Sequence, residues 1–172
     1  MEVINIEMAV KKLAQFWREQ KISSPPNGIQ EILHFEFSKS VKLPDDFRHL
    51  YMMTNGMVNL FSNDMDYEGF LFYPLQELTT LEEEFELDKV NYVESCIIFA
   101  EYMHRSWWYG VRFSKIEDNY EIGKIPTEYK FKVITRSLGE FIQFNMKDDS
   151  VLCDYDQWRL HFPLGQKGIP TM

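Results

Sequence analysis

Apolar residues recur at helical spacing near the start of the chain. Val10, Leu13 and Trp17 follow Ile6 at intervals of three or four residues, which is the period of one face of an α-helix. Asn5 precedes this series, where its side chain can cap the first turn. The pattern predicts an amphipathic helix that ends before a turn rich in serine and proline.

A second, shorter apolar face follows that turn. Its members are Ile29, Ile32, Leu33 and Phe35. Their spacing is again that of a helix, so these side chains are predicted to form the apolar stripe of a second helix.

The stretch from Leu43 to Gly56 predicts a third helix. Pro44 suits the first turn, where a missing backbone N–H has no consequence, and the acidic pair that ends at Asp46 favours the positive end of the helix dipole. Asn55 and Gly56 both accept φ > 0, so they are expected to form the exit of the helix. The apolar positions of its buried face are Phe47, Leu50 and Tyr51.

After Gly56 the period changes to that of short strands. The predicted strands are 69–75, 96–102, 107–113, 119–126 and 132–134. A helix is predicted over 79–90, and Ser137 with Glu140 forms a capping box that opens a last helix. Short turns between consecutive strands favour an antiparallel meander. The expected fold is α+β, a single domain over 1–172, with N-terminal helices packed on a mostly antiparallel sheet and a further helix near the C-terminus.

Composition changes this picture in two respects. Aromatic residues make up 16% of the chain, including 14 Phe, so the core is expected to consist largely of rings. Eighteen basic against 27 acidic side chains leave a formal charge of -9, which repels phosphate backbones and argues against nucleic-acid binding. The same field raises the rate of encounter with a basic protein.

Localisation and metal content follow from what the pattern lacks. No apolar run approaches the length of a membrane span, and the N-terminus is acidic where a signal peptide needs lysines. We therefore expect a cytoplasmic protein that does not enter a membrane. Cys96 and Cys153 are isolated, so neither a redox motif nor a zinc site is indicated, and no cofactor is expected.

A family resemblance rests on the second and third predicted helices. An apolar helix leads to Leu-Pro, an acidic residue, an aromatic residue, a short apolar helix and Asn-Gly. The residues that carry this pattern are Ile29, Ile32, Leu43, Pro44, Asp46, Phe47, Leu50, Tyr51, Asn55 and Gly56. In order and spacing they resemble the SMI1/KNR4 family of the SUKH superfamily, with weaker agreement over about residues 25–147.

The resemblance implies a non-enzymatic, cytoplasmic protein-binding module. Bacterial members are commonly immunity proteins that neutralise a cognate polymorphic toxin, often a nuclease or deaminase, so the implied partner is a toxin domain. Fungal members resemble scaffolds that regulate cell-wall synthesis, which leaves a scaffold or envelope regulator as the alternative. The family has no catalytic residues to carry over, and the motif positions are expected to be structural.

An acidic segment is the first candidate binding site. Asp64, Asp66 and Glu68 alternate before Gly69, which resembles the opening of a calcium loop. The twelfth position of such a loop requires a bidentate acid but is occupied here by Leu75. A solvated hairpin tip and a partner-facing acidic loop are therefore the two readings that remain, and no metal is assigned.

The second candidate combines a guanidinium with large rings. Arg105, Trp107, Trp108 and Tyr109 belong to the residue types enriched at protein-interface hot spots. Because neighbours on a strand point to opposite faces, Trp107 and Tyr109 share one side and Trp108 takes the other. Both sides could be covered by helices or loops, or one could contact a partner.

No pattern of residues indicates an enzyme. The run Glu82–Glu84 with Glu86 splays around a helix and cannot converge on one bond. The four histidines are scattered without metal or triad spacing, and nucleophile and phosphate-loop motifs are absent. An uncharacterised enzyme therefore remains only a remote alternative.

Overall fold

Three helices come first in the chain. The computed structural model describes residues 4–58, 65–86, 96–113, 119–126 and 130–152. Helices α1 (Ile6–Glu19), α2 (Ile29–Lys39) and α3 (Asp45–Met53) occur where the apolar spacing predicts them. Asn5 caps α1 as expected, because its side chain accepts a hydrogen bond from the Met8 N–H at 3.2 Å.

An antiparallel sheet follows the helices. Its strands are β1 (Phe70–Phe72), β2 (Thr79–Thr80), β3 (Ile97–Tyr102), β4 (Trp107–Phe113), β5 (Tyr120–Ile125) and β6 (Lys132–Thr135). The strand order is β1-β3-β4-β5-β6, and β2 pairs with the other end of β3. Strands β3 to β6 form the expected meander, which confirms an α+β fold with an antiparallel sheet.

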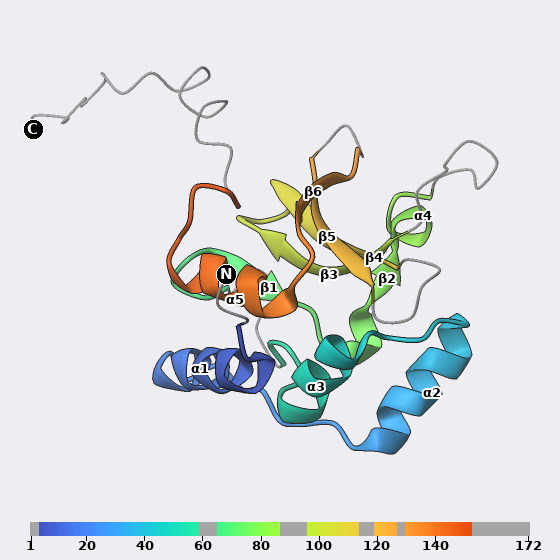
Figure 1. Ribbon diagram of the computed structural model, residues 1–172, viewed down its shortest axis with the longest axis horizontal. Helices are drawn as coiled ribbons and strands as arrows, with labels where there is room; N and C mark the ends of the chain where they lie inside the picture. The colour runs from blue at the N-terminus through green and yellow to red at the C-terminus, as the bar shows by residue number, and fades with distance from the viewer. Residues whose placement is uncertain (1–3, 59–64, 87–95, 114–118, 127–129, 153–172) are drawn as a thin grey trace, which may run out of the picture.

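Aromatic side chains join the helices to one face of the sheet. Helices α1, α3 and α5 (Leu138–Met146) cover this face (Figure 1). The ring pairs that link them are Trp17–Phe72, Phe47–Phe99, Phe99–Phe141 and Tyr109–Phe141, with centroids 5.1 to 5.3 Å apart. All four pairs meet edge to face, an arrangement that the ring quadrupoles favour. Helix α2 lies outside this layer, next to α3 and the short 3₁₀ helix η1 (Leu75–Glu77).

The opposite face of the sheet is covered by smaller elements. The ring of Phe85, just after α4 (Leu81–Glu84), meets Trp108 at 4.7 Å. Gly110 and Gly123 leave room for neighbouring side chains, because an added Cβ would lie 2.8 Å from Cys96 Sγ and 2.5 Å from the Phe131 ring. These close approaches explain why the two central strands carry glycine on this face.

Two predicted elements are shorter in the structure. The strand predicted over 69–75 is limited to β1, because the chain turns into η1 after Pro74. The helix predicted over 79–90 is α4 in the described residues, and residues 87–95 lie outside the described part. Thr79 and Thr80 instead pair with Ile98 and Ile97, because β-branched side chains fit a sheet edge.

The start of α5 corrects one detail of capping. Ser137 accepts a hydrogen bond from the Glu140 N–H at 3.3 Å, as a capping box requires. The Glu140 carboxylate does not return to the Ser137 backbone but accepts a hydrogen bond from the Thr135 hydroxyl. The Ser137 N–H donates to Thr135 Oγ1 instead, so the threonine at the end of β6 replaces the second half of the box.

Candidate functional site

The first part of the Leu43–Gly56 motif connects α2 to α3. Leu43 is buried, and its backbone N–H donates to Glu36 Oε1 at 2.8 Å. Arg48 holds both oxygens of the same carboxylate, with Nε to Oε1 at 2.8 Å and Nη2 to Oε2 at 2.7 Å. Pro44 is the N-cap residue, so the helix begins one residue later than predicted. The Leu-Pro step therefore fixes where α3 starts relative to α2.

Asp46 joins α3 to the sheet and to α5. Its Oδ2 accepts a hydrogen bond from the Tyr120 hydroxyl at 2.5 Å, and the Leu138 N–H donates to that hydroxyl at 2.8 Å. Burial, with the hydrogen bond to Asp46, raises the pKa of Tyr120 above its usual range, so the phenol stays protonated. Phe47, Leu50 and Tyr51 are fully buried, as predicted.

Asn55 and Gly56 form the end of the motif. Asn55 takes part in a closed ring of three side-chain amides, in which Asn27 donates to Asn55, Asn55 to Gln76, and Gln76 to Asn27, at 2.8 to 3.3 Å. Asn55 Oδ1 also accepts from the Leu75 N–H. Gly56 has φ of +60°, and an added Cβ would lie 2.4 Å from Tyr73 O. The motif residues thus form their contacts within the protein.

The acidic segment is anchored to the body of the molecule at Asp66. Its side chain is 3% exposed, and Oδ1 accepts hydrogen bonds from the N–H groups of Glu68 and Phe70. Burial raises the pKa of Asp66 to about 6, although these N–H groups and the nearby Trp17 indole N–H act in the opposite direction. Glu68 is partly exposed, and Asp64 lies outside the described residues. Asp66 therefore holds a turn rather than facing solvent.

The β3–β4 hairpin carries the second candidate. Trp107 and Trp108 are buried at 9% and 7% exposure, and Tyr109 is fully buried. The Trp107 indole N–H donates to the Tyr109 hydroxyl at 2.7 Å, and that hydroxyl donates to the Leu152 carbonyl at 2.8 Å. Burial of these rings agrees with coverage on both sides of β4, the first of the two readings.

Arg105 is the exposed member of this group. Its side chain is 62% exposed and lies 3.3 Å from Glu101 Oε2 and 3.5 Å from Glu84 Oε1. Met103, His104 and Arg105 all have positive φ, between 44° and 65°, a conformation that non-glycine residues rarely adopt in succession. The tip of this hairpin thus presents a cation that two carboxylates hold in place.

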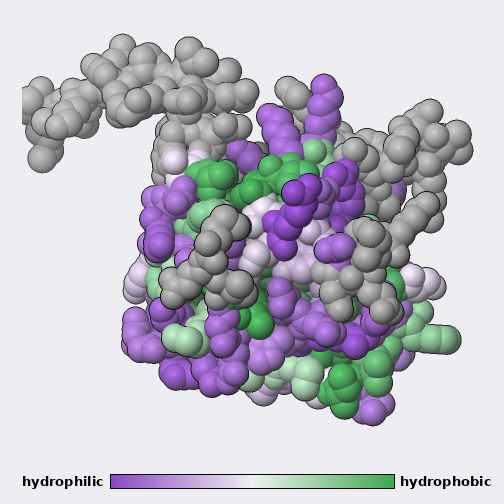
Figure 2. All heavy atoms as spheres, in the orientation of Figure 1, coloured by the Kyte–Doolittle hydropathy of each residue, from purple (hydrophilic) through white to green (hydrophobic). Residues whose placement is uncertain are grey.

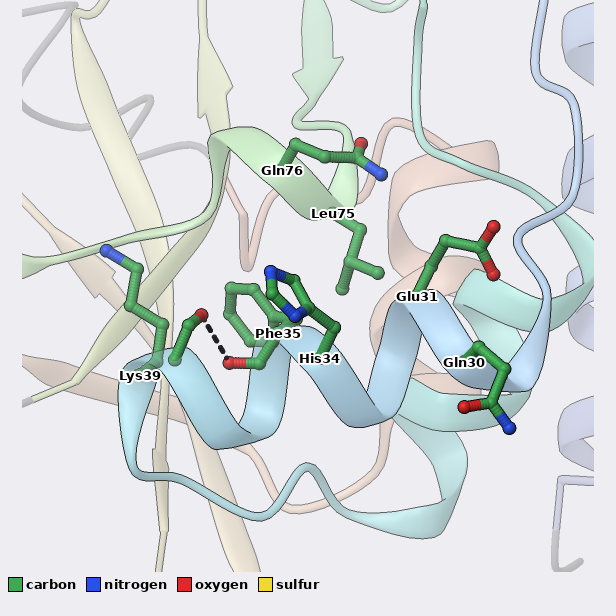
Figure 3. A pocket seen from close by; sticks show the side chains of 8 residues that line it. Gln30, Glu31, His34, Phe35, Lys39, Leu75 and Gln76 are labelled. Atoms are coloured by element: carbon green, nitrogen blue, oxygen red, sulfur yellow. Dashed lines mark hydrogen bonds between the residues drawn. The ribbon is translucent and has the colours of Figure 1, made fainter.

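The sequence pattern did not predict that α2 has exposed apolar residues on its outer surface. Ile32 and Phe35 of the predicted apolar stripe are buried, but Ile29 and Leu33 are 44% and 45% exposed, so only part of the stripe faces the core. Glu36 lies on the core-facing side instead, and its carboxylate forms an ion pair with Arg48. A pocket of about 510 Å³ lies between α2 and η1, with Phe35 and Leu75 among its lining residues (Figure 3). The reading of apolar periodicity treats every glutamate as exposed, so it could not predict which side of α2 is buried.

Comparison with protein families decides the identity of the fold. The model of the SMI1 / KNR4 family (SUKH-1) matches residues 26–143, well over half of the chain. The chain belongs to the SMI1/KNR4 family. The family resemblance inferred from the motif is thereby confirmed, and the match runs from just before α2 into α5. No curated protein matched the chain.

The described residues contain neither a metal-ligand cluster nor a membrane-spanning helix. Within the described residues, no three His, Cys, Asp or Glu side chains are grouped so that they could hold a metal ion. In the same part of the chain, no helix is long and apolar enough to cross a membrane. Among the features described above, the Arg105 hairpin tip and the outer surface of α2 are exposed, and Glu68 is partly exposed.

Proposed function

We propose that this SMI1/KNR4 protein is a non-enzymatic binding module of the immunity type, which neutralises a cognate toxin domain by covering its surface. The observation that carries the proposal is the family match over residues 26–143. The motif residues support it indirectly, since their contacts are internal and leave binding to other parts of the surface.

Charge supports a basic partner. The formal charge of -9 accelerates the approach of a cationic protein. Exposed apolar side chains would then provide the slow dissociation that a neutralising complex needs. An immunity protein has to capture its toxin quickly and hold it, and these two properties serve the two steps separately.

The candidate residues contribute to this proposal in different ways. Glu68 and Arg105 are accessible and could contact a partner directly. Trp107, Trp108 and Tyr109 are buried and would act by supporting the hairpin that carries Arg105.

An affinity pull-down of the tagged full-length protein from its native host tests the function. Bound chains are identified by mass spectrometry at low and moderate salt. We expect one stoichiometric toxin domain, released progressively as salt rises, and we expect deletion of the gene to make cells sensitive to that toxin. Several envelope enzymes at low occupancy would favour the scaffold alternative, and a fully resistant deletion strain would contradict the immunity role.

A further inference from the structure

An apolar stripe runs along the outside of α2. Ile29, Leu33 and Phe37 are four positions apart, which places them on one side of the helix. They are 44%, 45% and 86% exposed, and Phe37 is the most exposed large apolar side chain among the described residues. Figure 2 shows apolar surface at the lower right of the molecule, where Figure 1 places α2. Exposed apolar residues at helical spacing are typical of a surface that another chain covers.

The pocket borders this stripe on the next side of the helix. Phe35 and Leu75 are 7% and 1% exposed and give it an apolar base, while Glu31, Lys39 and Gln76 bring polar groups to its edge (Figure 3). Gln76 is held in place by the amide ring with Asn27 and Asn55. The pocket is therefore apolar at its base, polar at its edge and supported by residues whose positions are fixed.

Charges around the pocket are unevenly compensated. Lys39 pairs with Glu83 at 2.8 Å, and Arg48 pairs with Glu36 at 2.7 Å. Within the described residues, Glu31 of α2 and Glu77 of η1 have no ion pair. The region thus combines an apolar surface with negative charge that is not neutralised, which is complementary to an apolar surface with positive charge.

We propose that the outer surface of α2, together with the pocket between α2 and η1, is the docking surface for a basic protein partner, which inserts a lysine or arginine side chain into the pocket. The aliphatic stem of that side chain would pack on Phe35 and Leu75, and its charged end would lie beside Glu31. Apolar side chains of the partner cover Ile29, Leu33 and Phe37. This assignment rests on the proposed protein-binding function and adds where and through which chemistry the partner binds.

A synthetic helical peptide tests the chemistry of the surface without knowledge of the partner. The probe has leucines along one face and lysines on the other, and in the control peptide glutamates replace the lysines. Each is titrated into isotope-labelled full-length protein while backbone amide signals are followed by NMR. We expect the lysine peptide to shift signals of α2 and η1, and the glutamate peptide to bind at least about tenfold more weakly.

Three variants locate the binding. Phe37→Glu should weaken binding of the lysine peptide by about tenfold, because it removes the most exposed apolar contact. Glu31→Gln should weaken binding of the same peptide by about threefold. Met8→Glu is the matched control, since Met8 is 58% exposed on α1 and the change alters the net charge as Phe37→Glu does. It should leave affinity within about twofold. Unfolding midpoints of all three should stay near that of the parent protein, because each side chain lies at the surface.

The outcomes separate this proposal from the proposed function. Shifts spread over other acidic surfaces, or equal weakening by Met8→Glu and Phe37→Glu, would overturn the docking surface. If Phe37→Glu retains the toxin captured in the pull-down as well as the parent does, the function stands and this surface is wrong. If the peptide binds at α2 as described but the host supplies no toxin partner, the docking chemistry is supported and the immunity role fails.

Discussion

Asn55 and Gly56 end α3 by different means. The backbone of Gly56 adopts φ of +60°, as predicted, whereas Asn55 contributes its side-chain amide to the ring with Asn27 and Gln76. Asp66, by sequence a candidate for contact with a partner, is instead a buried acceptor for two backbone N–H groups. The residue type showed which contacts each side chain can form, but burial determined which of these contacts it forms.

Gly56→Ala should destabilise the protein by about 2–4 kcal/mol, because alanine disfavours the positive φ and its Cβ would meet the Tyr73 carbonyl. Gly28→Ala is the matched control. Its Cβ would approach only the end of the Glu31 side chain, so a loss of no more than about 1 kcal/mol is expected, because alanine is a poorer N-cap than glycine. Urea unfolding measures both, and equal losses would contradict the steric argument.

Asp66 should make stability depend on pH. Its folded pKa of about 6 lies above the unfolded value of 3.8, so its contribution is fully present below pH 4 and is lost as the pH rises through 6. Asp66→Asn retains the acceptor oxygen but does not titrate. Between pH 4 and pH 7, the free energy of unfolding of this variant should rise by about 2–3 kcal/mol relative to that of the parent, as measured by urea unfolding. A difference between the two proteins that does not change with pH would contradict this account.

At the scale of elements, helix existence followed from spacing but helix orientation did not. The apolar series on α1 and α3 identified their buried sides, and Val10, Leu13 and Trp17 are fully buried. On α2 the buried side is rotated, because Glu36 faces inward and is compensated by Arg48. An ion pair between two helices is not visible in the apolar pattern of either one, and Ile29 and Leu33 are exposed whereas Glu36 is buried.

Arg48→Ala tests this ion pair. It should lower the free energy of unfolding by about 2–3 kcal/mol, since it leaves the nearly buried Glu36 carboxylate without its cation, although Arg48 itself is a quarter exposed. Lys11→Ala, which breaks the exposed pair with Glu7, should change stability by no more than about 0.5 kcal/mol. Adding Glu36→Gln to Arg48→Ala should recover part of the loss, and no recovery would mean that Arg48 acts through packing.

At the scale of the whole molecule, the sheet separates two unlike faces. Three helices and a cluster of rings fill one face, while α4, Phe85 and Phe131 cover parts of the other. Helix α2 lies outside both layers (Figure 1), which leaves its outer surface accessible. The net charge belongs to the molecule as a whole and acts over distances larger than any single contact.

The charge of -9 should appear in association kinetics. The association rate with the captured toxin domain should fall about tenfold between low salt and ~0.5 M salt, because screening removes the attraction. The dissociation rate should change by less than about twofold, since short-range apolar contacts determine it. Surface plasmon resonance measures both rates, and an association rate that is independent of salt would exclude electrostatic steering.

By itself the sequence determined the order of helices and strands, the family and the internal role of its motif, because local spacing, capping residues and turn residues act over a few positions. Only the tertiary structure decided which side of α2 is buried, that Asp66 lies inside, and that Trp107, Trp108 and Tyr109 are covered. These outcomes depend on contacts between different elements, such as Glu36 of α2 with Arg48 of α3, or Tyr109 of β4 with Leu152 beyond α5. Burial is a property of the assembled layers, and no single segment contains the information that sets it.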